Sequence, residues 1–165
     1  MGEPPTQQHV AIRPAGFHDA ATVAAIWHRG WQQGHQGNVP DELARVRTEA
    51  SFGARARERV TATTVAEVDG LVAGFIMVAG DEVEQVYVDE AHRGTEVGAV
   101  LLAEAERQVL AGGHDTAWLA VVAGNRPARR FYAKHGWIDE GPFDYLAPGP
   151  EGPIPVPCRR YVKAL

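Results

Sequence analysis

The chain has a single cysteine, Cys158, and fewer basic than acidic residues. One cysteine excludes an internal disulfide framework and a cysteine-based zinc site. The 16 Lys and Arg residues against 21 Asp and Glu residues give a formal net charge of −5, which argues against a protein that neutralises nucleic-acid phosphates. No apolar run approaches the ~18 residues of a membrane span, so neither a nucleic acid nor a membrane is an expected partner.

The N-terminal segment also lacks a basic patch followed by an apolar stretch, so it does not read as a secretory signal. We interpret residues 1–8 as a flexible polar tail and residues 9–165 as one domain, expected to be cytoplasmic by elimination. Hydrophobic residues make up 45% of the chain and charged residues 22%, which is typical of a folded globular protein with a sizeable core. Cys158 is interpreted as structural, because no partner residue suggests reactivity.

Hydrophobic patterning predicts a mixed α/β (α+β) domain with the element order β-α-α-β-β-β-α-β-α-β-β. The clearest signal is an antiparallel meander, in which Asp69-Gly70 forms a hairpin turn between two Val-rich runs. The predicted strands cover residues 9–13, 60–68, 71–79, 82–88, 116–122, 137–146 and 158–165. The predicted helices begin near residue 19 and at residue 40, and cover 95–111 and 125–135.

Two stretches are expected to lie outside regular structure. The helix that opens at Pro40 is expected to end near Gly53, and the arginine-rich residues 55–59 are interpreted as solvated. Residues 147–157 carry five prolines and are interpreted as a stiff loop between the last two strands.

The loop after the meander opens a helix and predicts an anion site. Its residues are Arg93, Gly94, Thr95, Glu96, Val97, Gly98 and Ala99. A helix opening presents unpaired backbone N–H groups at the positive end of the helix dipole, glycines allow a ligand to come close, and an arginine adds charge. The alternative is that the glycines serve only a tight turn. The pattern is neither a P-loop nor the dinucleotide-binding triple-glycine motif.

Two motifs together resemble the GNAT superfamily, the GCN5-related N-acetyltransferases. The first is residues 93–98 followed by an apolar helix, and the second is Asn125-x-x-Ala128-x-x-Phe131-Tyr132-x-x-x-Gly136-Trp137. The resemblance implies a single GNAT domain over residues 9–165, with a mixed, mostly antiparallel sheet of about seven strands and helices on both faces. It also implies transfer of the acetyl group of acetyl-CoA to a primary amine, by direct attack through a tetrahedral intermediate and without a metal.

One position departs from the family pattern. Glu96 stands where the family has its first glycine, and a carboxylate aimed at a diphosphate would cost on the order of 1 kcal/mol. The alternative is that Glu96 points outward and favours the helix N-terminus. We favour the second interpretation, because backbone N–H groups rather than the missing side chain bind the phosphates.

Acetyl transfer needs a deprotonated amine, a stabilised oxyanion and a proton for the departing thiolate. Strict strand alternation places Glu82 and Glu84 on one face with Val86 and Val88, and makes the two glutamates candidates for the general base. Glu82 matches a glutamate common in the family. The alternative is that both are ordinary solvated acids near a strand end.

Tyr132 is the favoured catalytic acid. It shares a helical face with Ala128, Phe131 and His135, so its side chain is expected to face the sheet. The resemblance implies that this tyrosine protonates the coenzyme A sulfur; the alternative is a core tyrosine. Asn125 is expected to cap the same helix and, by resemblance, to touch the pantetheine arm.

The resemblance also implies where the rest of acetyl-CoA lies. Its pantetheine amides would pair with the backbone of Val86, Tyr87 and Val88, where one N–H group also holds the oxyanion. Arg130, with Arg126 and Arg129, would form a basic edge for the nucleotide phosphates; ordinary surface arginines are the alternative.

The acceptor is expected to be a small-molecule amine, bound beside Trp31, His35 and Tyr145. Loops shape such a pocket, so the sequence does not identify the amine. Two other functions stay open: a coenzyme A-binding or degenerate GNAT domain, and acetylation of a protein N-terminus or lysine. A homodimer paired through the last strands is a further alternative.

Overall fold

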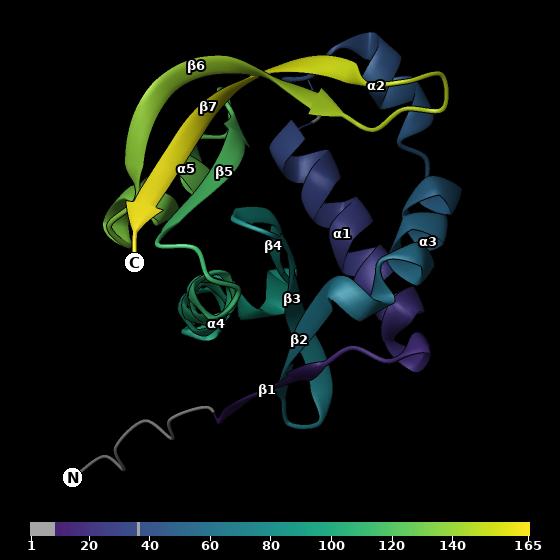
Figure 1. Ribbon diagram of the computed structural model, residues 1–165. Coiled ribbons are helices and arrows are strands. Elements are labelled where there is room, and N and C mark those ends of the chain that lie inside the picture. Colours follow the sequence, from purple (N-terminus) through teal and green to yellow (C-terminus); the bar gives the residue numbers. More distant parts are fainter. Residues whose placement is uncertain (1–8, 36) are drawn as a thin grey trace, which may run out of the picture.

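The computed structural model describes residues 9–35 and 37–165, so the expected tail over residues 1–8 lies outside the described part. One seven-stranded sheet runs through this part of the chain in the order β1-β2-β3-β4-β5-β7-β6. Only β4 and β5 pair in parallel among these neighbours. Helices α1, α2 and α3 lie on one side of the sheet, and α4 and α5 on the other (Figure 1).

The elements follow the predicted order closely. The strands are β1 (Val10–Pro14), β2 (Thr63–Val68), β3 (Leu71–Ala79), β4 (Glu82–Val88), β5 (Thr116–Val122), β6 (Ile138–Ala147) and β7 (Ile154–Ala164). The helices are α1 (Ala20–His35), α2 (Asp41–Val46), α3 (Glu49–Glu58), α4 (Val97–Ala111) and α5 (Arg126–Lys134). Three short 3-10 turns are η1 (Phe17–Asp19), η2 (Val60–Ala62) and η3 (Glu90–His92).

The region after Pro40 differs from the prediction, because it contains two helices. Thr48 begins the second one, α3, and its side chain accepts a 3.2 Å hydrogen bond from the Ser51 N–H. The interpretation of residues 55–59 as solvated is confirmed for Arg57 and Glu58, which are exposed, and wrong for two others: Ala56 is fully buried, and Arg55 lies over the ring of Trp27. The many charges of this stretch conceal the helical period that turns these two residues inward.

The proline-rich stretch is also corrected, because β7 begins at Ile154. Pro155 pairs with Leu146 and Pro157 with Asp144 on β6. On its other side β7 meets β5 only from Cys158 onward, so the two prolines lie on a sheet edge. A missing N–H is tolerated at an edge, which explains how prolines enter this strand.

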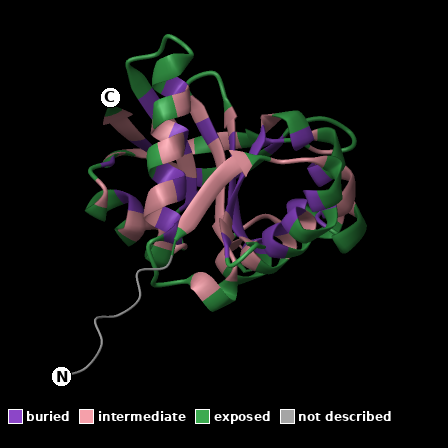
Figure 2. Cartoon of the chain, turned by 90° about the horizontal axis from the view of Figure 1, so that it is seen from below, coloured by how far each residue is buried: buried purple, intermediate pink, exposed green. Residues whose placement is uncertain are grey.

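Two hydrophobic clusters fill the spaces between the sheet and the helices, and Figure 2 shows buried residues gathered there with exposed residues outside. On the α1 side, Trp27 packs its ring edge-on against Phe52 and Phe75, with centroid distances of 5.5 and 5.8 Å. On the α4 side, fully buried Leu101 and Leu102 pack toward the sheet.

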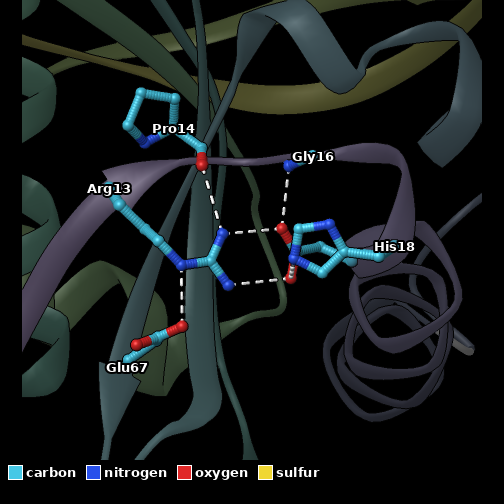
Figure 3. Close-up of polar contacts among 6 residues, drawn as sticks. Arg13, Pro14, Gly16, His18 and Glu67 are labelled. Atoms are coloured by element: carbon cyan, nitrogen blue, oxygen red, sulfur yellow. Dashed lines mark hydrogen bonds and ion pairs between the residues drawn. The ribbon is translucent and has the colours of Figure 1, made fainter.

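A charged network fixes the start of the domain. Arg13 on β1 donates to Glu67 on β2 at 2.7 Å and to both carboxylate oxygens of Asp19 at 2.7 and 2.9 Å. Asp19 also accepts from the Gly16 N–H at 2.8 Å, and Arg13 reaches the Pro14 carbonyl (Figure 3). The network therefore joins β1, β2 and the turn that leads into α1.

Candidate active site

The sheet opens between its two central strands. Glu82 and Trp118 form the single register pair of β4 with β5 in the described chain, and the Trp118 N–H donates to the Asp81 carbonyl at 3.0 Å. Beyond Glu82, β4 has no ladder partner on this side among the described residues. Backbone groups of β4 near Val86 are therefore available to a ligand.

A β-bulge lies just before this opening. Met77 pairs with Gln85 and Val78 with Val83, so Glu84 is an extra residue that shifts the alternation along β4. Val83, Val86 and Val88 consequently all pack with the α4-side cluster. The predicted common face of the two glutamates with Val86 and Val88 is therefore wrong, because strict alternation fails at a bulge.

The first cavity, which we call the cofactor groove, has a volume of about 620 Å³. It extends from the loop before α4, past β4, to α5. It is lined by most of the residues predicted to bind the cofactor: Val86, Tyr87, Val88, Arg93, Gly94, Thr95, Glu96, Gly98, Ala99 and Asn125.

The loop at one end of the groove is open and rich in donors. Gly94 has φ +74°, and a Cβ built there meets no neighbouring atom within 4 Å. The first intrahelical bond of α4 joins the Val100 N–H to the Glu96 carbonyl at 3.0 Å. The N–H groups of Gly98 and Ala99 precede this bond and are left to a ligand at the positive end of the helix dipole.

Glu96 lines the groove at this loop. Its side chain is exposed and forms no cap hydrogen bond, whereas the Val97 N–H approaches the Thr95 Oγ1 at 3.4 Å. The Val97 side chain is fully buried in the core, so only its backbone faces the loop region. The effect of Glu96 on cofactor affinity stays a prediction.

The structure places the arginines of α5 differently from the basic edge that the sequence predicts. Arg130 is exposed and is not among the residues that line the groove. Arg129 is bound to the Ala123 carbonyl, the Tyr161 hydroxyl and Asp139. Lys134 and His135 line the groove instead, and their spacing of three and four residues from Phe131 is the signal that could have found them.

The second cavity, which we call the acceptor pocket, has a volume of about 170 Å³ and lies on the α1 side. Glu82 and Glu84 line it, together with the predicted acceptor residues Trp31, His35 and Tyr145. Two further lining residues, Arg47 and Arg55, are not predicted from the sequence. Other arginines lie close to each of them in the sequence, and nothing there distinguishes a buried arginine from a solvated one.

Five residues line both cavities and mark where these meet: Val86, Tyr87, Asn125, Ala128 and Tyr132. Helix α1 comes very close to this junction. A Cβ built at Gly30 would lie 2.4 Å from the Tyr87 ring, so only glycine lets α1 approach β4 here. The junction is the place where a group held in the groove can reach a molecule in the pocket.

Tyr132 projects from α5 into this junction. It is 9% exposed, and burial raises its pKa well above the ordinary value, so its hydroxyl stays protonated at neutral pH. The Asn125 side chain accepts a 3.3 Å hydrogen bond from the Ala128 N–H, which confirms its capping role. The cap fixes the start of the helix that positions Tyr132.

The two glutamates have different surroundings. Glu82 Oε2 accepts a 2.7 Å hydrogen bond from the Tyr145 hydroxyl. Burial raises the pKa of Glu82, which the Tyr145 hydrogen bond opposes. Glu84 forms a 2.7 Å ion pair with Arg59. Glu82 is therefore more readily protonated than an ordinary glutamate, while Glu84 already has a cationic partner.

His35 is a neutral aromatic wall of the acceptor pocket. It stacks on Trp31 with ring centroids 5.6 Å apart and an interplanar angle of 7°. Burial, with the nearby charge of Arg47, lowers its pKa to about 4. Its buried Nδ1 has no hydrogen-bond partner within the described part of the chain.

The described residues contain neither a metal-binding cluster nor a membrane-spanning helix. No group of three or more His, Cys, Asp or Glu side chains is placed to hold a metal ion in residues 9–35 and 37–165. None of the helices within these ranges is long and apolar enough to cross a membrane.

Comparison with known proteins places this geometry in a family. A model of the Acetyltransferase (GNAT) family matches residues 23–137, whereas no protein of curated function matches the sequence. A GCN5-related N-acetyltransferase from Rhodopseudomonas palustris has 24% identity and a TM-score of 0.75, over 99% of this chain and 100% of that chain.

Two other solved structures have 18% identity and a TM-score of 0.70. They are yncA of Salmonella typhimurium with its cofactor acetyl-CoA, over 95% of this chain and 94% of that chain, and the PaiA N-acetyltransferase of Thermoplasma acidophilum with coenzyme A, over 95% and 99%. These likenesses confirm the predicted fold. Because the family model matches more than half of this chain, the chain belongs to the acetyltransferase (GNAT) family.

Proposed function

We propose that this protein transfers the acetyl group of acetyl-CoA to the primary amine of a small molecule. The observation that carries the proposal is the junction of the two cavities, where Tyr132 and Val86 line both. A donor in the cofactor groove and an amine in the acceptor pocket can meet there.

The cofactor groove fits acetyl-CoA on three counts. The open loop at Gly94 and the free N–H groups at the start of α4 suit a diphosphate. The unpaired side of β4 suits the two amides of the pantetheine arm. The groove is continuous from the loop to Tyr132, so the acetyl thioester, which supplies the acetyl group, would lie at the junction.

Different groups of this chain then accept the proton, stabilise the oxyanion and donate the proton. Glu82, directly or through a water molecule, accepts a proton from the incoming ammonium, because burial has raised the pKa of Glu82. The free amine attacks the acetyl carbon, and a backbone N–H of β4 stabilises the resulting oxyanion. The C–N bond forms first and gives a tetrahedral intermediate; the C–S bond then breaks, and the neutral Tyr132 hydroxyl donates its proton to the departing thiolate. The nitrogen of the new amide loses its extra proton, which returns through solvent to the Tyr132 oxygen.

The pocket favours a small acceptor over a protein side chain. Its volume is about 170 Å³, and its walls include the buried rings of Trp27 and Trp31. A lysine or protein N-terminus would need a surface groove open at both ends. A coenzyme A-binding domain without turnover is the second alternative. The exposed Glu96 in the loop before α4 is the feature that favours it.

The test is thiol release from acetyl-CoA with a panel of small amines, compared between the wild type and Tyr132→Phe. We expect turnover with some amine, a loss of about 100-fold or more in the variant, and unchanged acetyl-CoA binding by calorimetry. Tyr161→Phe is the matched control, because Tyr161 is also buried but lines neither cavity. Binding of acetyl-CoA without turnover of any amine would instead support the binding-only alternative.

A further inference from the structure

We propose that the acceptor is an amine that also carries an anionic group, a carboxylate or a phosphorus oxyanion, and that Arg47 and Arg55 hold this group. This inference rests on the proposed function and names the substrate class of the same site. It predicts an acceptor of amino-acid size, with its amine near Tyr132 and its acidic group at the α2–α3 side of the pocket.

Both arginines line the acceptor pocket, although they come from different helices. Arg47 follows α2 and is 9% exposed, and its Nη2 donates to the Pro148 carbonyl at 2.7 Å. Arg55 lies on α3, with its guanidinium carbon 4.3 Å from the centroid of the Trp27 ring. Stacking on a fixed ring holds the plane of this guanidinium and leaves its N–H donors at the edge.

Neither guanidinium has an acidic partner within the part of the chain that the structure describes. Ten ion pairs involve other basic residues, but none joins Arg47 or Arg55 to a carboxylate of the described residues. Glu84 is already paired with Arg59, and Glu82 accepts from Tyr145. The pocket therefore holds two cations whose charges no neighbouring carboxylate neutralises directly.

Two such charges in one buried pocket are costly for the protein alone. Burial, reinforced by the charge of Arg47, lowers the pKa of Arg55 to about 10, although it remains protonated at neutral pH. A buried charge without a partner destabilises a fold, and a ligand anion removes this penalty on binding. Two guanidiniums match the paired oxygens of a carboxylate or a phosphorus oxyanion, which a neutral amine does not offer.

The opposite charge needed for the amine is present in the same cavity. Glu82 lies on β4, whereas the two arginines come from the α2–α3 side. These opposite charges suit an acceptor that carries a positive and a negative end, and the volume of about 170 Å³ limits it to a small molecule.

The first experiment uses matched acceptors that differ only in the acid. Amino acids are compared with their amides, and 4-aminobutyrate with butylamine, by thiol release from acetyl-CoA. We expect kcat/KM to be about 10- to 100-fold higher for the acidic member of at least one pair. Equal rates for acidic and neutral members would overturn the inference while leaving the proposed acetyl transfer intact.

Variants locate the effect at the arginines. Arg55→Gln should remove most of the preference for acidic acceptors through a higher KM, and Arg55→Lys should restore part of it. Arg57→Gln is the matched control, since Arg57 lies on the same helix but is exposed and lines neither cavity. A loss of the same size with neutral amines, or in Arg57→Gln, would overturn the assignment.

A binding measurement separates this inference from the proposed function. N-acetyl amino acids, which resemble the product and have no free amine, are titrated calorimetrically onto the wild type and the Arg55 variants with coenzyme A present. We expect binding to the wild type that weakens about tenfold or more in Arg55→Gln. Such binding without turnover of any amine would support the anion site and contradict acetyl transfer; no binding of acids would contradict the anion site.

Discussion

The Glu82 carboxylate on β4 accepts a 2.7 Å hydrogen bond from the Tyr145 hydroxyl on β6. Strands β5 and β7 lie between β4 and β6 in the sheet, and both residues line the acceptor pocket. Burial raises the pKa of Glu82, and the hydrogen bond from Tyr145 works against this rise. The Tyr145 hydroxyl on β6 therefore favours the ionised form of the Glu82 carboxylate on β4.

The first prediction is that Tyr145→Phe moves the acidic limb of the pH profile to higher pH. Glu82 must be deprotonated to accept a proton, so activity falls as the pH drops below its pKa. Without the Tyr145 hydrogen bond, burial and the charges of Glu84 and Asp81 are opposed only by the charge of Arg59, and the pKa of Glu82 rises further. The measurement is kcat/KM against pH, with Tyr161→Phe as control. A limb that stays in place in Tyr145→Phe, and in Glu82→Gln, would remove Glu82 from the mechanism.

The sequence predicted the parts of the site that depend on short-range motifs. The loop at Gly94 and the helix that carries Tyr132 lie as expected, because a helix opening and a cap are set by neighbouring residues. The bulge at Glu84 was missed, because its register depends on how β3 pairs with β4. Arg55 was missed because its burial depends on Trp27, which lies on another helix. The bulge at Glu84 and the burial of Arg55 both depend on packing between elements that are separate in the sequence.

The second prediction concerns Glu96, whose exposed carboxylate lies beside the predicted diphosphate site. Water and salt screen an exposed charge, so Glu96→Gln should tighten acetyl-CoA binding by less than about fivefold, which corresponds to under ~1 kcal/mol. Calorimetry at low and high salt measures this change. A tightening of tenfold or more that disappears at high salt would show that Glu96 does repel the diphosphate.

The third prediction tests the close approach of α1 to β4. Gly30→Ala places a methyl group 2.4 Å from the Tyr87 ring, so the ring or the helix must move. We expect the free energy of unfolding to fall by about 1–3 kcal/mol and acetyl-CoA to bind more weakly, because Tyr87 lines both cavities. Urea unfolding and calorimetry measure the two effects.

The control for Gly30→Ala is Gly53→Ala on α3. A Cβ at Gly53 would lie 3.5 Å from its nearest neighbour, an Arg57 side-chain nitrogen, which is an ordinary van der Waals contact. Alanine should therefore raise the free energy of unfolding by about 0.5–1 kcal/mol through its better helix propensity. If both alanine variants were equally stable, the contact of Gly30 with Tyr87 would not limit the approach of the helix.

The fourth prediction concerns Asp19, which Arg13 binds through both carboxylate oxygens. The Arg13 guanidinium lowers the pKa of Asp19 to about 2 from 3.8. A lowered pKa means that the pair stabilises the fold above about pH 4, and that this contribution is lost as the pH falls toward 2. Asp19→Asn should therefore cost about 1–3 kcal/mol of unfolding free energy at neutral pH and progressively less in acid.

Urea unfolding between pH 2 and pH 7 measures this difference. Glu67→Gln is the comparison, because it removes the other carboxylate that Arg13 binds, but at a site whose side chain is 26% exposed. A partly exposed ion pair contributes less, so we expect a cost below about 1 kcal/mol there. If Asp19→Asn lost as much stability at pH 2 as at pH 7, the contribution of Asp19 would come from its shape and its bond to Gly16 rather than from its charge.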